Sequence, residues 1–398
     1  MVWLLAGIQF MQILDFVLMM PLGPQLMRLF QLTPSDFGLL ISVYMFGAAA
    51  SGLVASTVVD RFDRRKVLLA LIGGFSAAAL ATAASPSYAA LIAAHAAAGS
   101  CGGVLGMQVH AVIGDTIPDG RRGAATGVVM SAFAMASVAG VPIALVLADV
   151  GGWRAPFAVL AAGALVLLAL TLRTLPPLAG HLHGRTAGHF LASTRAVFAE
   201  PNHRRAFLVV AFLMLAGFSV IPYSAPYFVK NVGLKESEIS VLWFFGGLTT
   251  MFTSRWIGRQ IDLRGKQRVF RVVALLSCAP ILITTHLPPV PLSVAVLASV
   301  LFMTIVSGRF VPVMAMVNAA AAATAARQLS QRLRRRAAGL RGLRLVRRRA
   351  DHRLRTGRRA DALRLGRLVR RRDDARRGGR RAPRALGELA LAATIAAT

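Results

Sequence analysis

Asp15, His95 and Arg309 are among the ionisable residues that lie inside long apolar stretches of this sequence. Ionisable side chains in such stretches are rare and usually functional, because burying a charge is costly. An apolar environment disfavours the charged form of a carboxyl group. Asp15 is therefore our candidate for a group that binds and releases a proton or holds a cationic substrate. A carboxylate that is only hydrogen-bonded within a helix bundle is the alternative.

The other two residues could complete this chemistry. A histidine titrates near neutral pH, so His95 could share proton transfer with Asp15, although a packed, hydrogen-bonded histidine fits the sequence equally well. Arg309 needs an acid or water beside it, and Asp15 is one candidate partner. The sequence has no phosphate-binding glycine loop and no soluble catalytic constellation. We therefore expect no enzymatic activity, no cofactor, and an ion gradient as the energy source.

These residues must be positioned by membrane-spanning helices. The chain has 398 residues, of which 56% are hydrophobic and 16% are charged, which excludes an ordinary soluble enzyme. A spanning helix needs about 20 mainly apolar residues. The predicted fold class is an all-α polytopic membrane protein of the helical-bundle type. Its ten predicted spans are residues 3–27, 37–59, 66–84, 88–113, 124–148, 154–175, 205–229, 239–258, 268–287 and 291–318.

The charge of the loops predicts their side of the membrane. Basic residues follow the second, fourth, sixth and eighth spans, whereas Pro, Gly and Ser follow the third, fifth and ninth. Cytoplasmic loops carry the excess of Lys and Arg in membrane proteins. We therefore expect a multi-pass protein of the cell inner membrane whose N-terminus is cytoplasmic.

Composition divides the chain into four parts. Residues 1–175 are expected to form a six-helix bundle, 176–204 a cytoplasmic linker, 205–326 an incomplete bundle of four helices, and 327–398 a basic tail. An acid followed by a basic cluster comes after the second span of each bundle, and such weak internal repeats are typical of transporters. A repeat of six helices implies twelve, so the tail stands in the place of two.

Two charged loops on the predicted cytoplasmic side could act as gates. Gly52 permits a close helix approach before the first loop, and Asp60 can pair with the basic cluster or with a helix N-terminus. Inside-positive topology and a simple polar turn are the alternative interpretations. The residues to which we assign this gating role are Gly52, Asp60, Arg61, Arg64, Arg65, Lys66, Asp115, Arg121 and Arg122.

The fifth predicted span contains glycine and proline in its interior. Gly127, Gly140 and Pro142 weaken the backbone hydrogen bonds and permit bending. A packing kink without a role in transport is the alternative. The residues Gly-Trp-Arg follow this span at 152–154.

These three stretches are similar to the major facilitator superfamily, and within it to drug–proton antiporters of the arabinose and chloramphenicol efflux type. The resemblance covers roughly residues 5–326. It implies a monomeric secondary transporter that exports a small drug-like or sugar-like molecule by proton antiport and gives drug resistance. It also implies that the first, fourth, seventh and tenth helices line a central cavity. That cavity would contain Asp15, His95, Gln108, Tyr223, Tyr227, Arg309 and Asn318.

The tail, residues 327–398, differs from the rest of the chain. It holds 24 of the 46 basic residues, all of them arginine, and no aromatic residue, in a chain of net charge +30. Out-of-frame translation of GC-rich DNA yields such a composition, and we favour this origin for the tail. In that case, one alternative is that the chain is an inactive, truncated permease. A genuine tail would instead belong to a membrane-anchored protein that binds nucleic acid or anionic lipid. Without a genuine tail we expect no nucleic-acid partner. A disordered tail is expected from either origin.

The sequence predicts no metal site. His181, His183 and His189 lie close together in the linker, where a solvated loop is the simpler interpretation. Cys101 and Cys278 both lie in apolar runs, which disfavours a disulfide framework.

Overall fold

The described part of the chain is helical, as predicted. Contacts group Met1–Ala321 into one compact unit, and the few described residues beyond it form an exposed helical segment. The rest of the predicted tail, including its expected disorder, lies outside the described residues. The computed structural model describes residues 1–180, 199–317, 319, 363 and 365–371.

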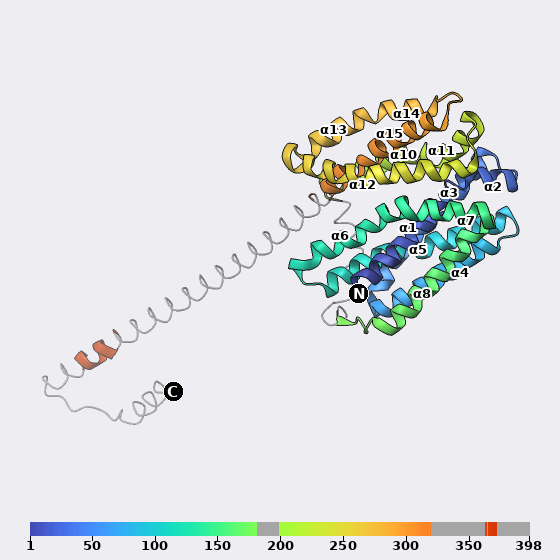
Figure 1. Ribbon diagram of the computed structural model, residues 1–398. Coiled ribbons are helices and arrows are strands. Elements are labelled where there is room, and N and C mark those ends of the chain that lie inside the picture. The colour runs from blue at the N-terminus through green and yellow to red at the C-terminus, as the bar shows by residue number, and fades with distance from the viewer. Residues whose placement is uncertain (181–198, 318, 320–362, 364, 372–398) are drawn as a thin grey trace, which may run out of the picture. The chain divides into compact units, whose positions relative to one another are not determined.

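Long helices joined by short turns make up the first half of the unit (Figure 1). They are α1 (Val2–Leu18), α2 (Gly23–Leu29), α3 (Pro34–Val58), η1 (Val59–Arg61), α4 (Arg64–Ala84), α5 (Tyr88–Thr116), α6 (Asp119–Met135), η2 (Ala136–Gly140), α7 (Val141–Gly151) and α8 (Arg154–Thr174).

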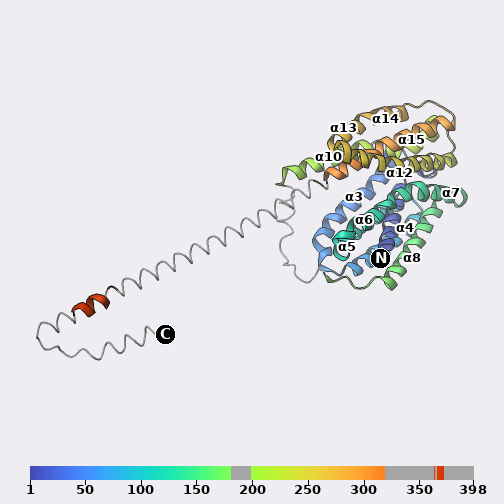
Figure 2. The ribbon, with the colours of Figure 1, turned by 60° about the vertical axis from the view of Figure 1, so that its left-hand side comes forward.

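The second half has shorter and more broken helices. They are α10 (Pro201–Phe218), α11 (Ile221–Tyr227), η4 (Phe228–Val232), η5 (Glu236–Glu238), α12 (Ile239–Arg264), α13 (Lys266–Leu276), α14 (Cys278–Thr285) and α15 (Leu292–Gly308). In Figures 1 and 2, α13, α14 and α15 lie on one side of α12, and the helices of the first half lie on its other side.

Each of the ten predicted spans overlaps one or more of these helices. Within the described residues, eight helices are long and apolar enough to cross a membrane, and the bent pair α1–α2 would be a ninth. The remaining predicted span, 239–258, lies on α12, which is 26 residues long. Arg255 and Arg259 interrupt the second half of this helix, and α12 is not among the eight. The structure therefore confirms the fold class with fewer strongly apolar spans than predicted.

Proline and capping residues decide where helices begin and bend. α1 and α2 meet at an angle of 53°, where Pro24 occupies the first turn of α2. α3 begins at Pro34, earlier than hydropathy predicts, because Thr33 caps it: the Asp36 amide donates to the Thr33 hydroxyl at 3.2 Å, and the Thr33 amide donates to the Asp36 carboxylate at 2.9 Å.

The fifth predicted span widens in its middle. α6 passes into η2, a π-helical turn of five residues, before α7 begins. Pro142 is at the second position of α7 and has no N–H to donate to the preceding turn. The wide turn therefore lies next to the glycine and proline that were predicted to bend this helix.

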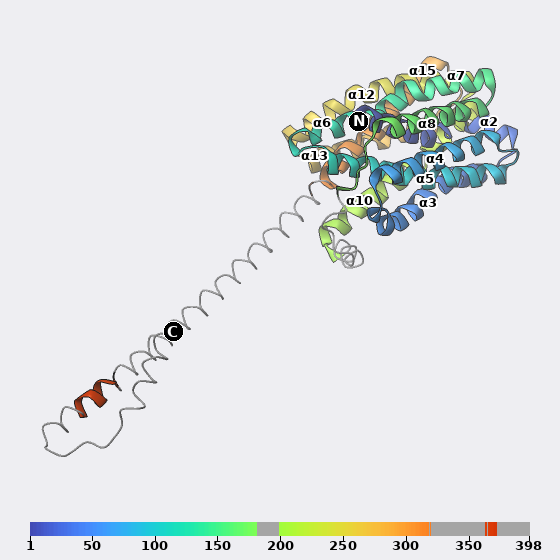
Figure 3. The same ribbon diagram turned by 90° about the horizontal axis from the view of Figure 1, so that it is seen from below.

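The two ends of the bundle differ in charge and in packing. We call the end that holds residues 60–66, 115–122 and 264–268 the basic end, and the other end the opposite end. Towards the opposite end, one apolar core joins both halves: Leu18 and Phe37 share it with Phe228 and Leu242. Towards the basic end, the described cores are separate, one around Leu5, Ile72 and Ile113 and one around Ile257, Val269 and Val273. Figure 3 shows the helices from below, with α6 and α13 towards one end of the bundle and α2 and α7 towards the other.

Candidate functional site

Asp15 lies in the last turn of α1. Its side chain is fully buried, and neither carboxylate oxygen has a hydrogen-bond partner in the described part of the chain. The adjacent Leu14 packs on Gly140 of η2, where an added Cβ would lie 2.9 Å from the leucine Cδ1. Tyr44 of α3 reaches this part of α1 through its hydroxyl, which donates to the Gln12 carbonyl at 3.4 Å. A carboxyl group in such a place is stable as the neutral acid or beside a bound cation or water.

His95 is on α5 and is as deeply buried as Asp15. Neither ring nitrogen has a hydrogen-bond partner among the described residues. Its ring centroid lies 4.9 Å from that of Tyr44, with the ring planes tilted by 44°. Gly99 allows this approach, because any side chain there would overlap the Tyr44 backbone. Tyr44 thus lies against His95 and against the turn of α1 before Asp15, although it is uncharged and gave no signal in the sequence.

Arg309 is buried in the second half of the unit, away from this group. Its Nη1 donates to the Ser277 hydroxyl at 3.3 Å, and its Nε donates to the Val306 carbonyl at 3.1 Å. The expected pairing with Asp15 is not formed, because the contacts of Arg309 come from its own helix and from the junction of α13 and α14. No carboxylate pairs with this guanidinium in the described ranges.

Arg64 is the centre of a charged cluster at the basic end. Its buried guanidinium bridges two carboxylates, Asp60 at 2.7 Å and Asp115 at 3.1 Å. Its Nη1 also donates to the Gln108 side chain at 3.4 Å. The structure therefore places Gln108, which we predicted in the central cavity, against the predicted gating residues instead. Three of the residues to which we assigned the gating role, Asp60, Arg64 and Asp115, therefore lie together.

The remaining predicted gating residues bind loop backbones or face outward. Arg65 donates to the Leu172 carbonyl at 2.6 Å, and Arg122 donates to the Gly114 carbonyl at 2.8 Å. Gly52 brings α3 close to α5, since a Cβ there would lie 3.3 Å from the Met107 methyl group. Three residues are exposed, namely Arg61, Lys66 and Arg121.

Asp63 makes further polar contacts at the basic end, and the sequence gave no sign of them. Its carboxylate accepts hydrogen bonds from the Arg65 amide at 2.7 Å and from the Leu178 amide at 3.1 Å. Partial burial raises the pKa of this carboxyl, but the amide donors and the nearby Lys66 charge outweigh it, so the pKa is lowered. Asp63 thus ties the segment after α8 to the start of α4.

Tyr223 and Tyr227 lie in α11, where the two halves meet near the opposite end. The Tyr223 hydroxyl lies against Gly38 of α3, and the Tyr227 hydroxyl donates to the Leu287 carbonyl at 3.1 Å. Pro226 of the same helix lies over Gly23, where a Cβ would be 2.9 Å from its Cγ. Asn318, the last predicted cavity residue, lies outside the described residues.

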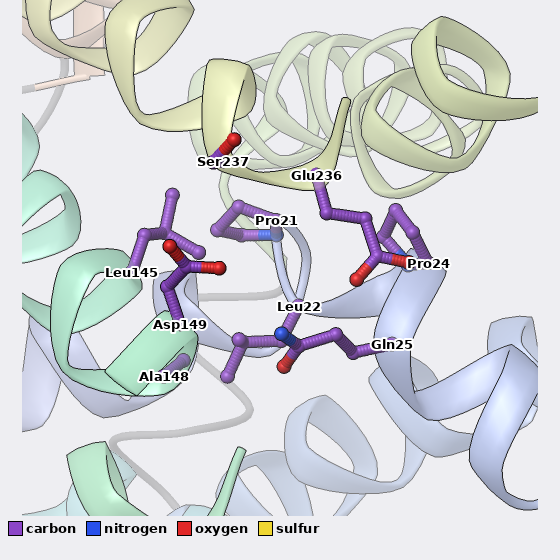
Figure 4. A pocket seen from close by; sticks show the side chains of 9 residues that line it. All are labelled: Pro21, Leu22, Pro24, Gln25, Leu145, Ala148, Asp149, Glu236 and Ser237. Carbon is purple, nitrogen blue, oxygen red and sulfur yellow. The ribbon is translucent and has the colours of Figure 1, made fainter. Parts of the chain in front are cut away.

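An ion pair links the two halves at the opposite end, and a small pocket lies between them there. Arg28 pairs with Glu236, with a second contact from Nη2 at 3.2 Å. Figure 4 shows the pocket beside this pair, where the turn between α1 and α2, helix α7 and η5 meet. Its lining includes Pro21, Gln25 and Asp149.

The three residues predicted to bend the fifth span have different surroundings. Gly140 has α1 packed against it, and Pro142 begins α7, whereas Gly127 is exposed with no atom near enough to meet an added Cβ. Gly247 of α12 lies against the backbone of Ser137, with an added Cβ 2.9 Å from its carbonyl carbon. The η2 turn is therefore held between α1 and α12.

The described residues contain no group of three or more His, Cys, Asp or Glu side chains placed to hold a metal ion. The histidines of the predicted linker cluster lie outside them. Cys101 and Cys278 are free thiols.

Comparison with known proteins identifies the family of this helical bundle. The sequence model of the Major Facilitator Superfamily matches residues 5–343. The chain belongs to the major facilitator superfamily. This facilitator chain is 29% identical over 175 residues to YceJ of Bacillus subtilis, an MFS-type transporter; the match covers 44% of this chain and 45% of YceJ. The chain thus spans less than half the length of that relative.

Solved facilitator structures have the same fold. A bacterial homologue of the human lysosomal transporter Spinster, in an inward-facing and occupied conformation, has a TM-score of 0.58 and 16% identity, with 80% of this chain and 77% of that one covered. A D-xylose–proton symporter has a TM-score of 0.61 and 16% identity, with 78% and 80% covered. Their likeness establishes the facilitator fold. The family match, together with the apolar helices, makes this chain a multi-pass membrane protein of a transporter family, and the members of that family are not enzymes.

Proposed function

We propose that this transporter exports a small drug-like or sugar-like molecule across the inner membrane in exchange for protons. The observation that carries this proposal is the buried carboxyl of Asp15, which has no hydrogen-bond partner among the described residues and lies on the first helix of the bundle. A carboxyl held in this way binds a proton when it is closed off and releases it when solvent or a cationic substrate arrives. His95 is the second candidate for this role.

Alternating access supplies the transport cycle in this proposal. The shared core, the Arg28–Glu236 pair and the contacts of α11 close the opposite end, whereas separate cores lie towards the basic end. We assign the basic end to the cytoplasm because it carries the Lys and Arg residues. The Arg64 cluster would act as the gate at that end, and the Gly-Trp-Arg ending of the fifth span favours export over uptake.

The direct test uses membrane vesicles that contain the full chain and hold an imposed pH gradient. Ethidium and L-arabinose serve as probes, and a fluorescent pH indicator reports proton movement. We expect at least one probe to collapse the gradient, and Asp15→Asn to lower that rate by about tenfold or more. Asp262→Asn, which changes an exposed acid of α12, is the matched control and should behave like the unmodified chain. Full proton-coupled flux through Asp15→Asn would contradict the proposal.

We also propose that residues 327–398 are translated out of frame. Support comes from their composition, which combines 24 arginines with no lysine and no aromatic residue. Sequencing the coding DNA across codons 310–340 tests this: a neighbouring frame should encode two apolar spans of about 20 residues each. If no frame does, the tail is genuine, and its binding to nucleic acid or anionic lipid, weakened by salt, becomes the expectation to test. We also propose that the transporter works as a monomer.

A further inference from the structure

A stripe of polar residues connects Asp15 with the part of α1 nearer the basic end. Gln9, Gln12 and Asp15 follow one another at intervals of three residues, which places neighbours on adjoining positions of the helix surface. The Gln9 Nε2 donates to the Gln12 Oε1 at 3.2 Å. The amide groups of this stripe are therefore already connected to each other.

The helix opposite this stripe has glycines in place of side chains. A Cβ added at Gly106 of α5 would lie 3.5 Å from the Gln12 Oε1 and 3.9 Å from the Gln9 amide. A Cβ added at Gly102 would lie 2.5 Å from the Tyr44 hydroxyl. These glycines leave the space between α1, α3 and α5 to polar groups, although α5 is otherwise a mainly apolar helix.

Tyr44 connects the stripe with His95. Its hydroxyl donates to the Gln12 carbonyl at 3.4 Å, and its ring lies against that of His95. The titratable groups near this part of α1 are Tyr44 of α3 and His95 and Cys101 of α5. The polar groups from Gln9 to His95 thus form one continuous series.

Several atoms of this series are buried without a protein partner. They are the Gln9 Oε1, both carboxylate oxygens of Asp15 and both ring nitrogens of His95, counted among the described residues. Native proteins satisfy such atoms with bound water. These five atoms could bind a series of water molecules along which a proton can move. Proton relays through membranes consist of such groups.

We propose that Gln9, Gln12 and Tyr44 form the route by which protons pass between Asp15 and the basic end of the bundle. This inference rests on the proposed role of Asp15 as the proton carrier. The proton leaves the Asp15 carboxyl for a water molecule held by the glutamines, and an equivalent proton returns by the same series. Gln108, just beyond Gly106 on α5, binds Arg64 at the basic end, where Asp60 and Asp115 are exposed to solvent.

Infrared spectroscopy of the full chain in a lipid film tests the route without a substrate. Exchange of H2O for D2O shifts the band of a protonated carboxyl, and Asp15→Asn identifies the band of Asp15 by its loss. We expect Gln12→Leu to slow the exchange at Asp15 by about tenfold or more, because a leucine side chain cannot relay a proton. Gln260→Leu is the control, since Gln260 on α12 also has an unpartnered side-chain oxygen but lies outside the stripe.

The outcomes separate this inference from the proposed function. If the Asp15 band is present and exchanges equally fast in the unmodified chain and in Gln12→Leu, the route is wrong and the carrier role survives. If no protonated Asp15 band is seen at any pH at which the chain is folded, both the carrier role and the route are wrong. Equal slowing by Gln12→Leu and Gln260→Leu would also overturn the route, because the effect would not be specific to the stripe.

Discussion

Arg64 and Arg309 are both buried arginines, but their surroundings give them opposite energetic roles. Arg64 compensates two carboxylates and binds a buried glutamine. Arg309 has a hydroxyl and a carbonyl as its described partners and no carboxylate. Burying an unpaired charge opposes folding, whereas removing one partner from a charge cluster leaves other groups unsatisfied. The same substitution should therefore destabilise the protein at Arg64 but not at Arg309.

We expect Arg64→Met to lower the free energy of unfolding by about 1–3 kcal/mol, and Arg309→Met to leave it unchanged or raise it by about 1 kcal/mol. Thermal unfolding of the two purified variants in one detergent measures the difference. Each variant is the control for the other, because both lose the same side chain. A larger loss of stability from Arg309→Met than from Arg64→Met would contradict the assignment of their partners.

The carboxylate of Asp63 should make the stability of the protein depend on pH. Its pKa is lowered in the folded protein, so its contribution to stability is fully present above the pKa of the unfolded chain and is lost as the pH falls through the folded value. We expect Asp63→Ala to cost about 1 kcal/mol at pH 7, and this difference to shrink below about pH 4. Unfolding curves of both proteins at several pH values test this. A difference that is constant down to acid pH would show that the Asp63 carboxylate charge is not responsible.

At the scale of the helix, hydropathy predicted where elements lie but not how closely they approach. The residues 3–27 and 124–148 were recognised by apolar length, and both were correctly placed on helices. The 53° bend, the wide η2 turn and the contact of Gly247 with Ser137 depend on partners distant in sequence, which a local pattern cannot contain. Tyr44 and Gln12 were missed for the same reason. Their importance comes from the glycines of another helix.

Two glycines therefore have opposite predicted responses to alanine. Gly127 is exposed on α6 with open space around it, so Gly127→Ala should stabilise the helix by about 1 kcal/mol. Gly247→Ala should lower stability, because the new methyl group would press on the Ser137 backbone. Thermal unfolding of both variants tests this pair. If Gly247→Ala is as well tolerated as Gly127→Ala, the close approach of α12 to η2 does not exist in solution.

At the scale of the whole molecule, the halves are held together at one end. Their shared core lies towards the opposite end, and the Arg28–Glu236 pair joins residues 208 positions apart there. An exposed ion pair of this kind adds only about 0–1 kcal/mol to stability. Its value is as a marker of closure, since the two side chains meet only when this end is shut.

A cysteine pair at these positions should report that closure. In a chain with Cys101 and Cys278 changed to alanine, Arg28→Cys combined with Glu236→Cys should be cross-linked by a short bis-methanethiosulfonate reagent, which spans the gap that the two long side chains fill and that a direct disulfide would not. Proton-coupled flux of the probe should then stop and return after reduction, because alternating access requires this end to open. The reagent should leave the flux through each single-cysteine variant unchanged. Undiminished flux through the fully cross-linked protein would exclude opening at this end.

The η2 turn has a consequence for the length of the chain itself. A π-helical turn holds one residue more than the α-helical turn it replaces, so the five residues 136–140 contain one that the helix does not need for continuity. Deleting Ala139 should thus leave α6 and α7 in their original register as one regular α-helix, while the contacts of Gly140 with α1 are lost. Such a deletion would separate folding from conformational change. The shortened protein should still insert into the membrane and unfold cooperatively, but the helix formed by α6 and α7 would no longer bend at residues 136–140.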